Sequence, residues 1–105
     1  MDTRTGPTLE LLMARRERIR SLCRKYGVRS LQVFGSIARG EGGEGSDVDL
    51  LVRFSRPVGL FHLIRLEREL SEVLGVPVDL VTERALSPYI RAQVLAASQV
   101  VYEGS

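Results

Sequence analysis

The stretch from Gly35 to Val52 reads GSIARGEGGEGSDVDLLV, and the interpretation of the whole chain starts from it. It follows an apolar run that ends at Phe34, and its residues 41–49 include four acidic side chains and no basic one. Two carboxylates held about 4 Å apart repel each other by roughly 4 kcal/mol at an effective dielectric constant near 20. A fold that places Asp47 and Asp49 together is therefore expected to bind a cation.

Asp47 and Asp49 begin a segment, residues 47–54, in which apolar and polar residues alternate as they do in a strand. At this spacing both side chains leave one face of the strand about 6.6 Å apart along the backbone. Carboxylate oxygens suit Mg²⁺, which proteins commonly bind through one or two carboxylates together with substrate phosphates. Alternatively, the pair caps a turn or forms ion pairs with Arg39 or Arg53, and the residues alone leave both interpretations open.

A third acid, Asp79, interrupts the apolar run VPVDLV within residues 76–82, which are predicted to form another interior strand. An ionised group in such a strand costs several kcal/mol unless it is compensated. A third carboxylate beside the first two would supply the ligands for two divalent ions, which in such sites lie about 3.5–4 Å apart. The alternative is an aspartate at a strand end that is paired with an arginine.

Gly35 and Ser36 predict a seat for a phosphate group. Glycine permits close approach of the backbone, and a helical turn over residues 36–39 would present N–H groups and a hydroxyl to an anion. A simple helix cap at Ser36 uses the same geometry. Arg39 could hold a phosphate or only balance the carboxylates, and both roles stay open.

Context excludes two other glycine-rich motifs. Gly40, Gly42 and Gly45 match G-x-G-x-x-G but precede a strand instead of opening a helix after one, and no Gly-Lys-Ser/Thr follows them as a P-loop requires. His62 is the only histidine, and no ligand-type residue adjoins it in the sequence. A surface or half-buried histidine is therefore favoured over a catalytic one.

The remaining pattern predicts a single domain over residues 1–105, of the α/β or α+β class, with helices in two layers or three around a small sheet. Helices are expected over residues 8–26 and 60–74, which end at Gly27 and Gly75, and over residues 88–97, with Ser87 as the N-cap and Pro88 as the first helical residue. Strands are expected over residues 31–34, 47–54 and 76–82, with an apolar tail at residues 100–102 that could add an edge strand.

Composition narrows the protein class further. The hydrophobic share of 44% and charged share of 27% are typical of a globular protein, and no apolar run approaches the ~18 residues of a membrane span. The first residues lack the apolar core of a signal peptide, so we expect a cytoplasmic location. Cys23 is the only cysteine and is interpreted as a small buried hydrophobic residue.

The net charge of +2 is small but unevenly distributed. Residues 14–30 hold seven basic side chains and one acid, Glu17. This run is either a solvated helix face or a docking surface for an acidic partner or a nucleic acid.

The motif formed by Gly35-Ser36, ten intervening residues and Asp47-Val48-Asp49 resembles the signature of the minimal, MNT or MntA-type, members of the DNA polymerase β-like nucleotidyltransferase superfamily. The resemblance spans nearly the whole chain. It implies a palm-like mixed sheet backed by helices, and transfer of a nucleoside monophosphate, AMP from ATP, to a hydroxyl group with release of pyrophosphate.

The resemblance also implies roles for the site residues. Asp47 and Asp49 would hold two Mg²⁺ ions, and Asp79 would ligate the catalytic ion and help to deprotonate the acceptor. Gly35 and Ser36 would seat the triphosphate, with Arg39 beside them.

Minimal members of this superfamily lack the domains with which larger relatives hold their acceptors. They are often encoded beside a small helical HEPN-domain protein and act as the antitoxin of that pair, in characterised cases by adenylylating a tyrosine of the toxin. We therefore expect a heteromeric complex with a HEPN-type partner. Two alternatives are a non-catalytic nucleotide-binding module that occludes its partner, and a catalytic subunit that acts on a small molecule or RNA with a separate substrate-binding subunit.

Overall fold

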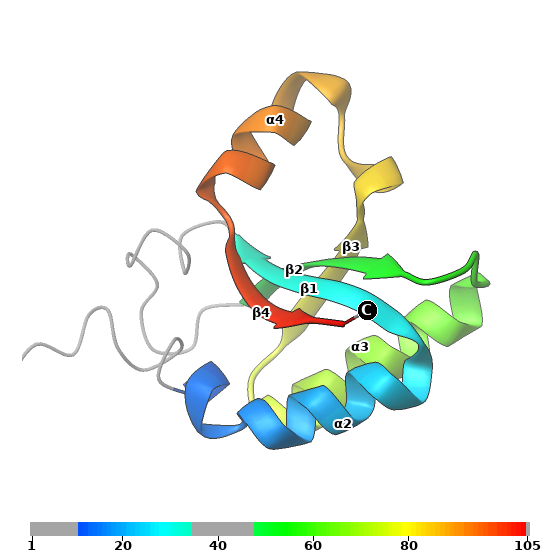
Figure 1. Cartoon of the computed structure of the whole chain (residues 1–105), viewed down its shortest axis with the longest axis vertical. Helices are drawn as coiled ribbons and strands as arrows, with labels where there is room; N and C mark the ends of the chain where they lie inside the picture. The colour runs from blue at the N-terminus through cyan, green and yellow to red at the C-terminus, as the bar shows by residue number, and fades with distance from the viewer. Residues whose placement is uncertain (1–10, 35–47, 105) are drawn as a thin grey trace, which may run out of the picture.

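The computed structural model describes residues 11–34 and 48–104, and Figure 1 shows them as a twisted sheet with helices on both faces. A helical turn over residues 11–14 leads into the first helix of the series. The elements that follow are α2 (Arg16–Tyr26), β1 (Val28–Phe34), β2 (Val48–Phe54), α3 (Leu60–Leu74), β3 (Val78–Thr82), the 3₁₀ helix η1 (Glu83–Ala85), α4 (Pro88–Ala97) and β4 (Gln99–Glu103).

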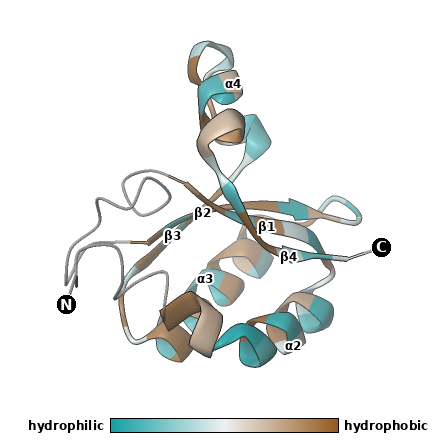
Figure 2. Ribbon diagram, turned by 60° about the vertical axis from the view of Figure 1, so that its left-hand side comes forward, coloured by the Kyte–Doolittle hydropathy of each residue, from teal (hydrophilic) through white to brown (hydrophobic). Residues whose placement is uncertain are grey.

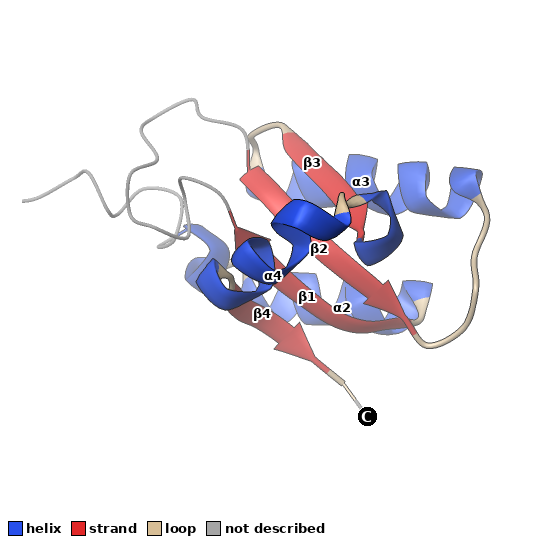
Figure 3. Cartoon of the chain, turned by 90° about the horizontal axis from the view of Figure 1, so that it is seen from above, coloured by secondary structure: helices blue, strands red, loops and turns tan. Residues whose placement is uncertain are grey.

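The four strands lie in the order β3-β2-β1-β4, as the view in Figure 3 shows. β1 is antiparallel to both of its neighbours, whereas β2 and β3 are parallel. Parallel neighbours need a long crossover connection, and α3 provides it. The sheet is therefore mixed, and its two edges are β3 and β4.

The hydrophobic core lies between the sheet and the pair α2 and α3, which run beneath it in Figure 1. α3 contributes an apolar stripe at every fourth residue, Leu66, Leu70 and Leu74, and all three are buried. From α2, Ile19 and Cys23 are almost fully buried. Burial raises the pKa of the Cys23 thiol to about 12, which agrees with its expected role as a buried hydrophobic residue.

Both core helices end at a glycine. Gly27 and Gly75 have φ values of 72° and 73°, a left-handed conformation that L side chains rarely adopt, and each backbone N–H bonds back to the last turn of its helix. The chain therefore leaves each helix abruptly and enters the next segment without a long loop.

His62 is half-buried and structural, as its sequence context predicted. Its Nε2 lies 2.7 Å from the carbonyl oxygen of Tyr26, and because a carbonyl only accepts, Nε2 is the donor. The imidazole also packs edge-on against the rings of Tyr26 and Phe54, with centroids 5.1 and 5.4 Å away. These contacts join the start of α3 to the ends of α2 and β2.

Several helices and strands begin or end at residues other than those predicted. The helix expected over residues 8–26 is interrupted at Arg15. The Nε of Arg15 donates to the carbonyl oxygen of Val73 at 3.2 Å. Residues 8–10 lie outside the described part of the chain. The first strand begins at Val28 instead of residue 31, because Val28 pairs with β2 and the polar Ser30 pairs with both β2 and β4. The third strand begins at Val78, after Pro77, which has no N–H to donate.

The apolar tail forms the predicted edge strand and is longer than expected, as β4. Its ladder with β1 shifts register between Leu31 and Gln32, which marks a β-bulge. None of the helices in residues 11–34 and 48–104 is long and apolar enough to cross a membrane.

The helix α4 stands on the opposite face of the sheet from α2 and α3, which we call the α4 face (Figures 1 and 2). Ser87 caps it by accepting the N–H of Tyr89 at 3.2 Å, and Pro88 is its first residue, as predicted. None of its ten residues is buried. Its large side chains Tyr89, Ile90 and Leu95 are 90%, 45% and 37% exposed.

We predict that α4 is the least protected helix of the isolated chain. Helices this short owe most of their stability to tertiary packing, and α4 has little of it. In hydrogen–deuterium exchange, the amides of α4 should exchange at least about tenfold faster than those of α3. Equal protection of the two helices would contradict this prediction, and α2, which has buried residues, serves as the control.

Candidate active site

Asp49 of β2 and Asp79 of β3 are direct partners in the parallel register of the two strands. Adjacent strands lie about 4.8 Å apart, and residues in register project from the same face. The residues on either side of each aspartate are buried against α2 and α3. The two carboxylates therefore stand side by side on the α4 face, where Asp49 is half-buried and Asp79 is exposed.

The predicted residues Gly35, Ser36, Arg39 and Asp47 lie outside the described residues. The described strands nevertheless fix the residues next to them in sequence. Phe34, which precedes Gly35, pairs with Asp49 across β1 and β2, and Val48, which follows Asp47, donates its N–H to the carbonyl oxygen of Pro77 at 2.9 Å. The two flanks of the GSIARGEGGEGSD segment thus meet at the Asp49–Asp79 pair.

The structure corrects the reasoning that led to Asp79. Residues 76–82 were expected to form an interior strand, but β3 is an edge strand and the Asp79 side chain is exposed. Burial therefore does not demand a compensating cation. A cation is instead expected because a second carboxylate, that of Asp49, lies directly beside Asp79, and like charges on paired residues destabilise a sheet.

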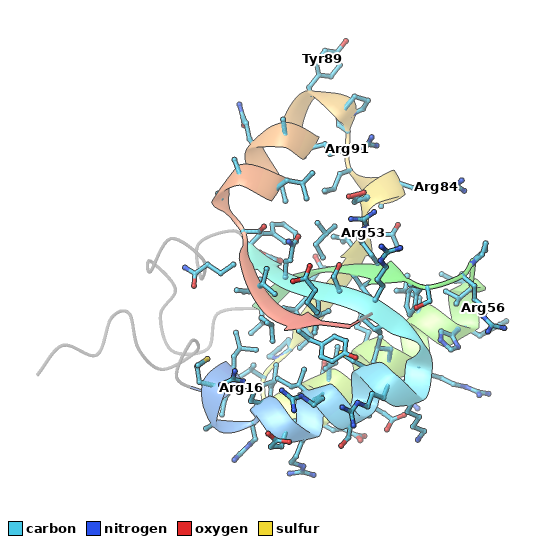
Figure 4. All side chains as sticks on the ribbon, in the orientation of Figure 1. Arg16, Arg53, Arg56, Arg84, Tyr89 and Arg91 are labelled. Carbon is cyan, nitrogen blue, oxygen red and sulfur yellow. The ribbon has the colours of Figure 1, made fainter. Side chains whose placement is uncertain are left out.

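The alternative interpretation of these aspartates was that they form ion pairs with arginines. Within the described residues Asp79 forms no ion pair with an arginine. Arg53 forms its ion pair with Glu83, Nε to Oε2 at 3.9 Å, at the opposite end of β2. Figure 4 shows Arg53 near η1, together with the labelled Arg84.

The described part of the chain brings together no group of three His, Cys, Asp or Glu side chains, so the third predicted ligand, Asp47, stays a prediction.

Two polar side chains of α3 hold β3 in place on both sides of Asp79. Glu67 Oε2 accepts the backbone N–H of Leu80 at 2.8 Å, and Ser71 Oγ accepts that of Val78 at 3.1 Å. The Ser71 hydroxyl in turn donates to the carbonyl oxygen of Glu67 at 2.9 Å. These bonds occupy donors that an edge strand would otherwise leave unpaired, and they fix the stretch of backbone from which Asp79 projects.

Glu67 and Ser71 were not predicted from the sequence as positioning residues. The available signal was their spacing: they are four residues apart, each directly after a leucine of the buried stripe of α3. That position borders the core, so a polar side chain there can reach the edge of a neighbouring strand.

Residues 15–101 match the profile of the nucleotidyltransferase domain family. Protein adenylyltransferase MntA of Thermococcus cleftensis is 42% identical over 92 residues, which cover 88% of this chain and 88% of that protein. A solved structure of a candidate minimal nucleotidyltransferase has a TM-score of 0.78 at 48% identity, covering 90% of this chain and 96% of that one. The fold and the family implied by the sequence motif are therefore confirmed.

A more distant structure contains a tri-AMPylated HEPN toxin of Shewanella oneidensis in complex with an MNT antitoxin. The matching chain has a TM-score of 0.66 at 21% identity, covering 89% of this chain and 73% of its own length. At that identity the likeness shows a shared fold alone.

We predict that Glu67→Leu lowers the free energy of unfolding by about 1–3 kcal/mol, because it leaves the N–H of Leu80 without an acceptor. Urea denaturation measures the loss. Glu67→Gln is the matched control, since its amide oxygen still accepts, and it should lose much less. A stable Glu67→Leu variant would show that the bond does not hold β3.

We also predict that Asp79→Asn stabilises the metal-free protein by about 0.2–1 kcal/mol, because it removes a like charge from beside Asp49. Thermal unfolding in a chelator should show the rise. Added Mg²⁺ should raise the melting temperature of the wild type but not that of Asp79→Asn. Glu72→Gln, an exposed change on α3, should respond to Mg²⁺ as the wild type does; equal responses of all three proteins would speak against a cation at this pair.

Proposed function

We propose that this chain, which belongs to the nucleotidyltransferase domain family, transfers AMP from ATP to a hydroxyl group of a partner protein. Its family membership makes it a nucleotidyltransferase, and its similarity to a protein adenylyltransferase over 88% of both chains supports AMP and a protein as the transferred group and the acceptor. The observation that carries the proposal is the in-register pair of Asp49 and Asp79 on one face of the sheet.

The donor set fits a divalent cation. Asp49 and Asp79 offer only oxygen atoms, come from two adjacent strands and leave room for water, because Asp79 is exposed. We propose that Asp47 completes the set and that the three aspartates hold two Mg²⁺ ions. When bound, the ions would neutralise phosphate charge and stabilise the charge that develops during transfer.

In the proposed reaction, the acceptor oxygen attacks the α-phosphorus of ATP, a new P–O bond forms, and the bond to the β-phosphate breaks, so that pyrophosphate leaves. The proton of the acceptor hydroxyl goes to Asp79, which is reachable from the α4 face. Gly35 and Ser36 would seat the triphosphate, with Arg39 beside it. Asp49 and Asp79 contribute mainly by holding their carboxylates in fixed positions on paired strands, because positioning and electrostatic stabilisation dominate phosphoryl transfer.

The proposed acceptor is a hydroxyl, a tyrosine in our hypothesis, on a HEPN-type partner that forms a complex with this chain. The distant structural neighbour from Shewanella oneidensis supports the idea, since it pairs an AMPylated HEPN toxin with a protein of this fold. The described residues support it in a second way: α4 carries uncovered apolar side chains on the same face as the aspartate pair. Figure 4 shows Tyr89 pointing away from the rest of the chain.

We predict that Asp49→Asn reduces AMP transfer at least about a hundredfold, because it removes charge from the centre of the proposed ion site. The assay mixes the purified chain with ATP labelled at the α-phosphate, Mg²⁺ and the protein encoded by the adjacent reading frame, and follows label in that protein. Glu72→Gln serves as the matched control and should retain full transfer.

The same assay separates the alternatives. Absence of label from the partner with the wild type, or equal labelling by Asp49→Asn, would reject the proposal. If Asp49→Asn still silences the partner's toxicity as well as the wild type does, the chain acts as an occluding module. Transfer of label to an RNA or a small molecule instead would identify a catalytic subunit with another acceptor.

A further inference from the structure

A groove of about 700 Å³ runs between α2 and the C-terminal strand, away from the aspartate pair. Three arginines of α2 line one side of it, Arg16, Arg20 and Arg24, and the residues from Val100 to Gly104 line the other. Arg16 is labelled in Figure 4, where it lies on α2 beneath β4. The site described above does not use this groove, since β3 and β4 are opposite edges of the sheet.

The three arginines form a row along one side of α2. They are spaced four residues apart, so that successive side chains start about 6 Å from each other along the helix. All three are exposed, and none forms an ion pair or a side-chain hydrogen bond with another described residue. Among the described residues that line the groove, Glu103 is the only acidic one. The row therefore presents positive charge that the described part of the chain does not neutralise.

The other wall of the groove is a strand edge that is still able to pair. β4 is the last strand of the sheet, and between Val100 and Glu103 no described residue bonds its outer side. The opposite edge differs, because Ser71 and Glu67 accept the N–H groups of Val78 and Leu80 in β3. Val100, at the rim of the groove, is 57% exposed. Proteins normally protect such edges, so an uncovered one marks a place where another chain can add a strand.

We propose that this groove binds an extended segment of a partner protein, which adds as a strand beside β4 and carries acidic side chains at alternate positions. Alternate residues of a strand lie about 6.6 Å apart on one face, close to the 6 Å step of the arginine row. Because α2 lies beneath the sheet, one face of the added strand would be turned toward the arginines (Figure 3). Backbone hydrogen bonds would supply affinity, and arginine–carboxylate pairs would select the sequence.

A peptide fits this groove better than a nucleic acid does. Single-stranded nucleic acids are held by aromatic side chains that stack on successive bases. Of the described residues that line the groove, only Tyr102 is aromatic, and it is half-buried in the sheet. The net charge of the chain is only +2. A free strand edge, by contrast, offers the backbone donors and acceptors that an extended peptide can use.

Binding of two synthetic peptides of equal composition tests the proposal. In the first, glutamate alternates with valine and threonine; in the second, the glutamates form one block. Fluorescence anisotropy should show that the alternating peptide binds the wild-type chain at least about tenfold more tightly than the block peptide does, because only the first can pair with β4 and face the arginines at every step. Methylating the backbone nitrogens on one edge of the alternating peptide should abolish binding.

Two double variants with the same change in net charge distinguish the effect of the arginine row on peptide binding from the effect of net charge alone. Arg20→Gln with Arg24→Gln should weaken binding of the alternating peptide about tenfold or more, while Arg18→Gln with Arg68→Gln, both exposed and outside the groove, should change it less than about twofold. Circular dichroism and thermal unfolding establish that both variants are folded.

Four outcomes would overturn the proposal: no binding of the alternating peptide at millimolar concentration, equal binding of both peptides, equal losses in the two double variants, or tighter binding of an oligouridylate than of the peptide. The last would identify a nucleic-acid surface. None of these results depends on AMP transfer, so the proposed function can fail or stand independently.

Discussion

The parallel pairing of β2 with β3 is the constraint on which the candidate site depends. It places Asp49 and Asp79 in register, on the face of the sheet that α2 and α3 leave uncovered. The pairing is in turn set by α3, whose leucine stripe anchors the crossover and whose Glu67 and Ser71 bond to β3. A shift of one residue in this register would turn one aspartate into the core, so packing and chemistry are fixed by the same contacts.

Much of the fold could be predicted because its signals are local. The period of the apolar residues located α3 and β2, and glycine and the Ser87-Pro88 pair located helix ends. The start of β1 was missed because Arg29 and Ser30 are polar, yet both lie in a strand paired on both sides, where tertiary pairing outweighs intrinsic preference. The order of the strands could not be predicted either, because an edge strand packed against a helix has the same apolar run as an interior strand.

Part of the candidate site could likewise be predicted from the sequence, and part could not. The spacing of Asp47 and Asp49 was enough to single out that pair, whereas Asp79 was chosen because it interrupts an apolar run, with an argument about burial that its exposed position in β3 removes. Glu67 and Ser71 were not found because each bonds to a backbone N–H, which leaves no complementary residue type in the sequence to pair with them. The family signature supplied what physical reasoning on single residues did not, the connection of the Gly-Ser turn with the acids.

The inequality of the two sheet edges also limits how copies of this chain can associate. Head-to-tail stacking, in which β4 of one copy joins β3 of the next, would generate an endless fibre, but α3 side chains already bond the N–H groups of Val78 and Leu80 on the β3 edge. Of the two strand edges, β4 is therefore the one that two copies would share more readily, in a two-fold arrangement that is complete after one step. Occupied donors on a single edge thus work against open-ended strand pairing while the other edge keeps its capacity to pair.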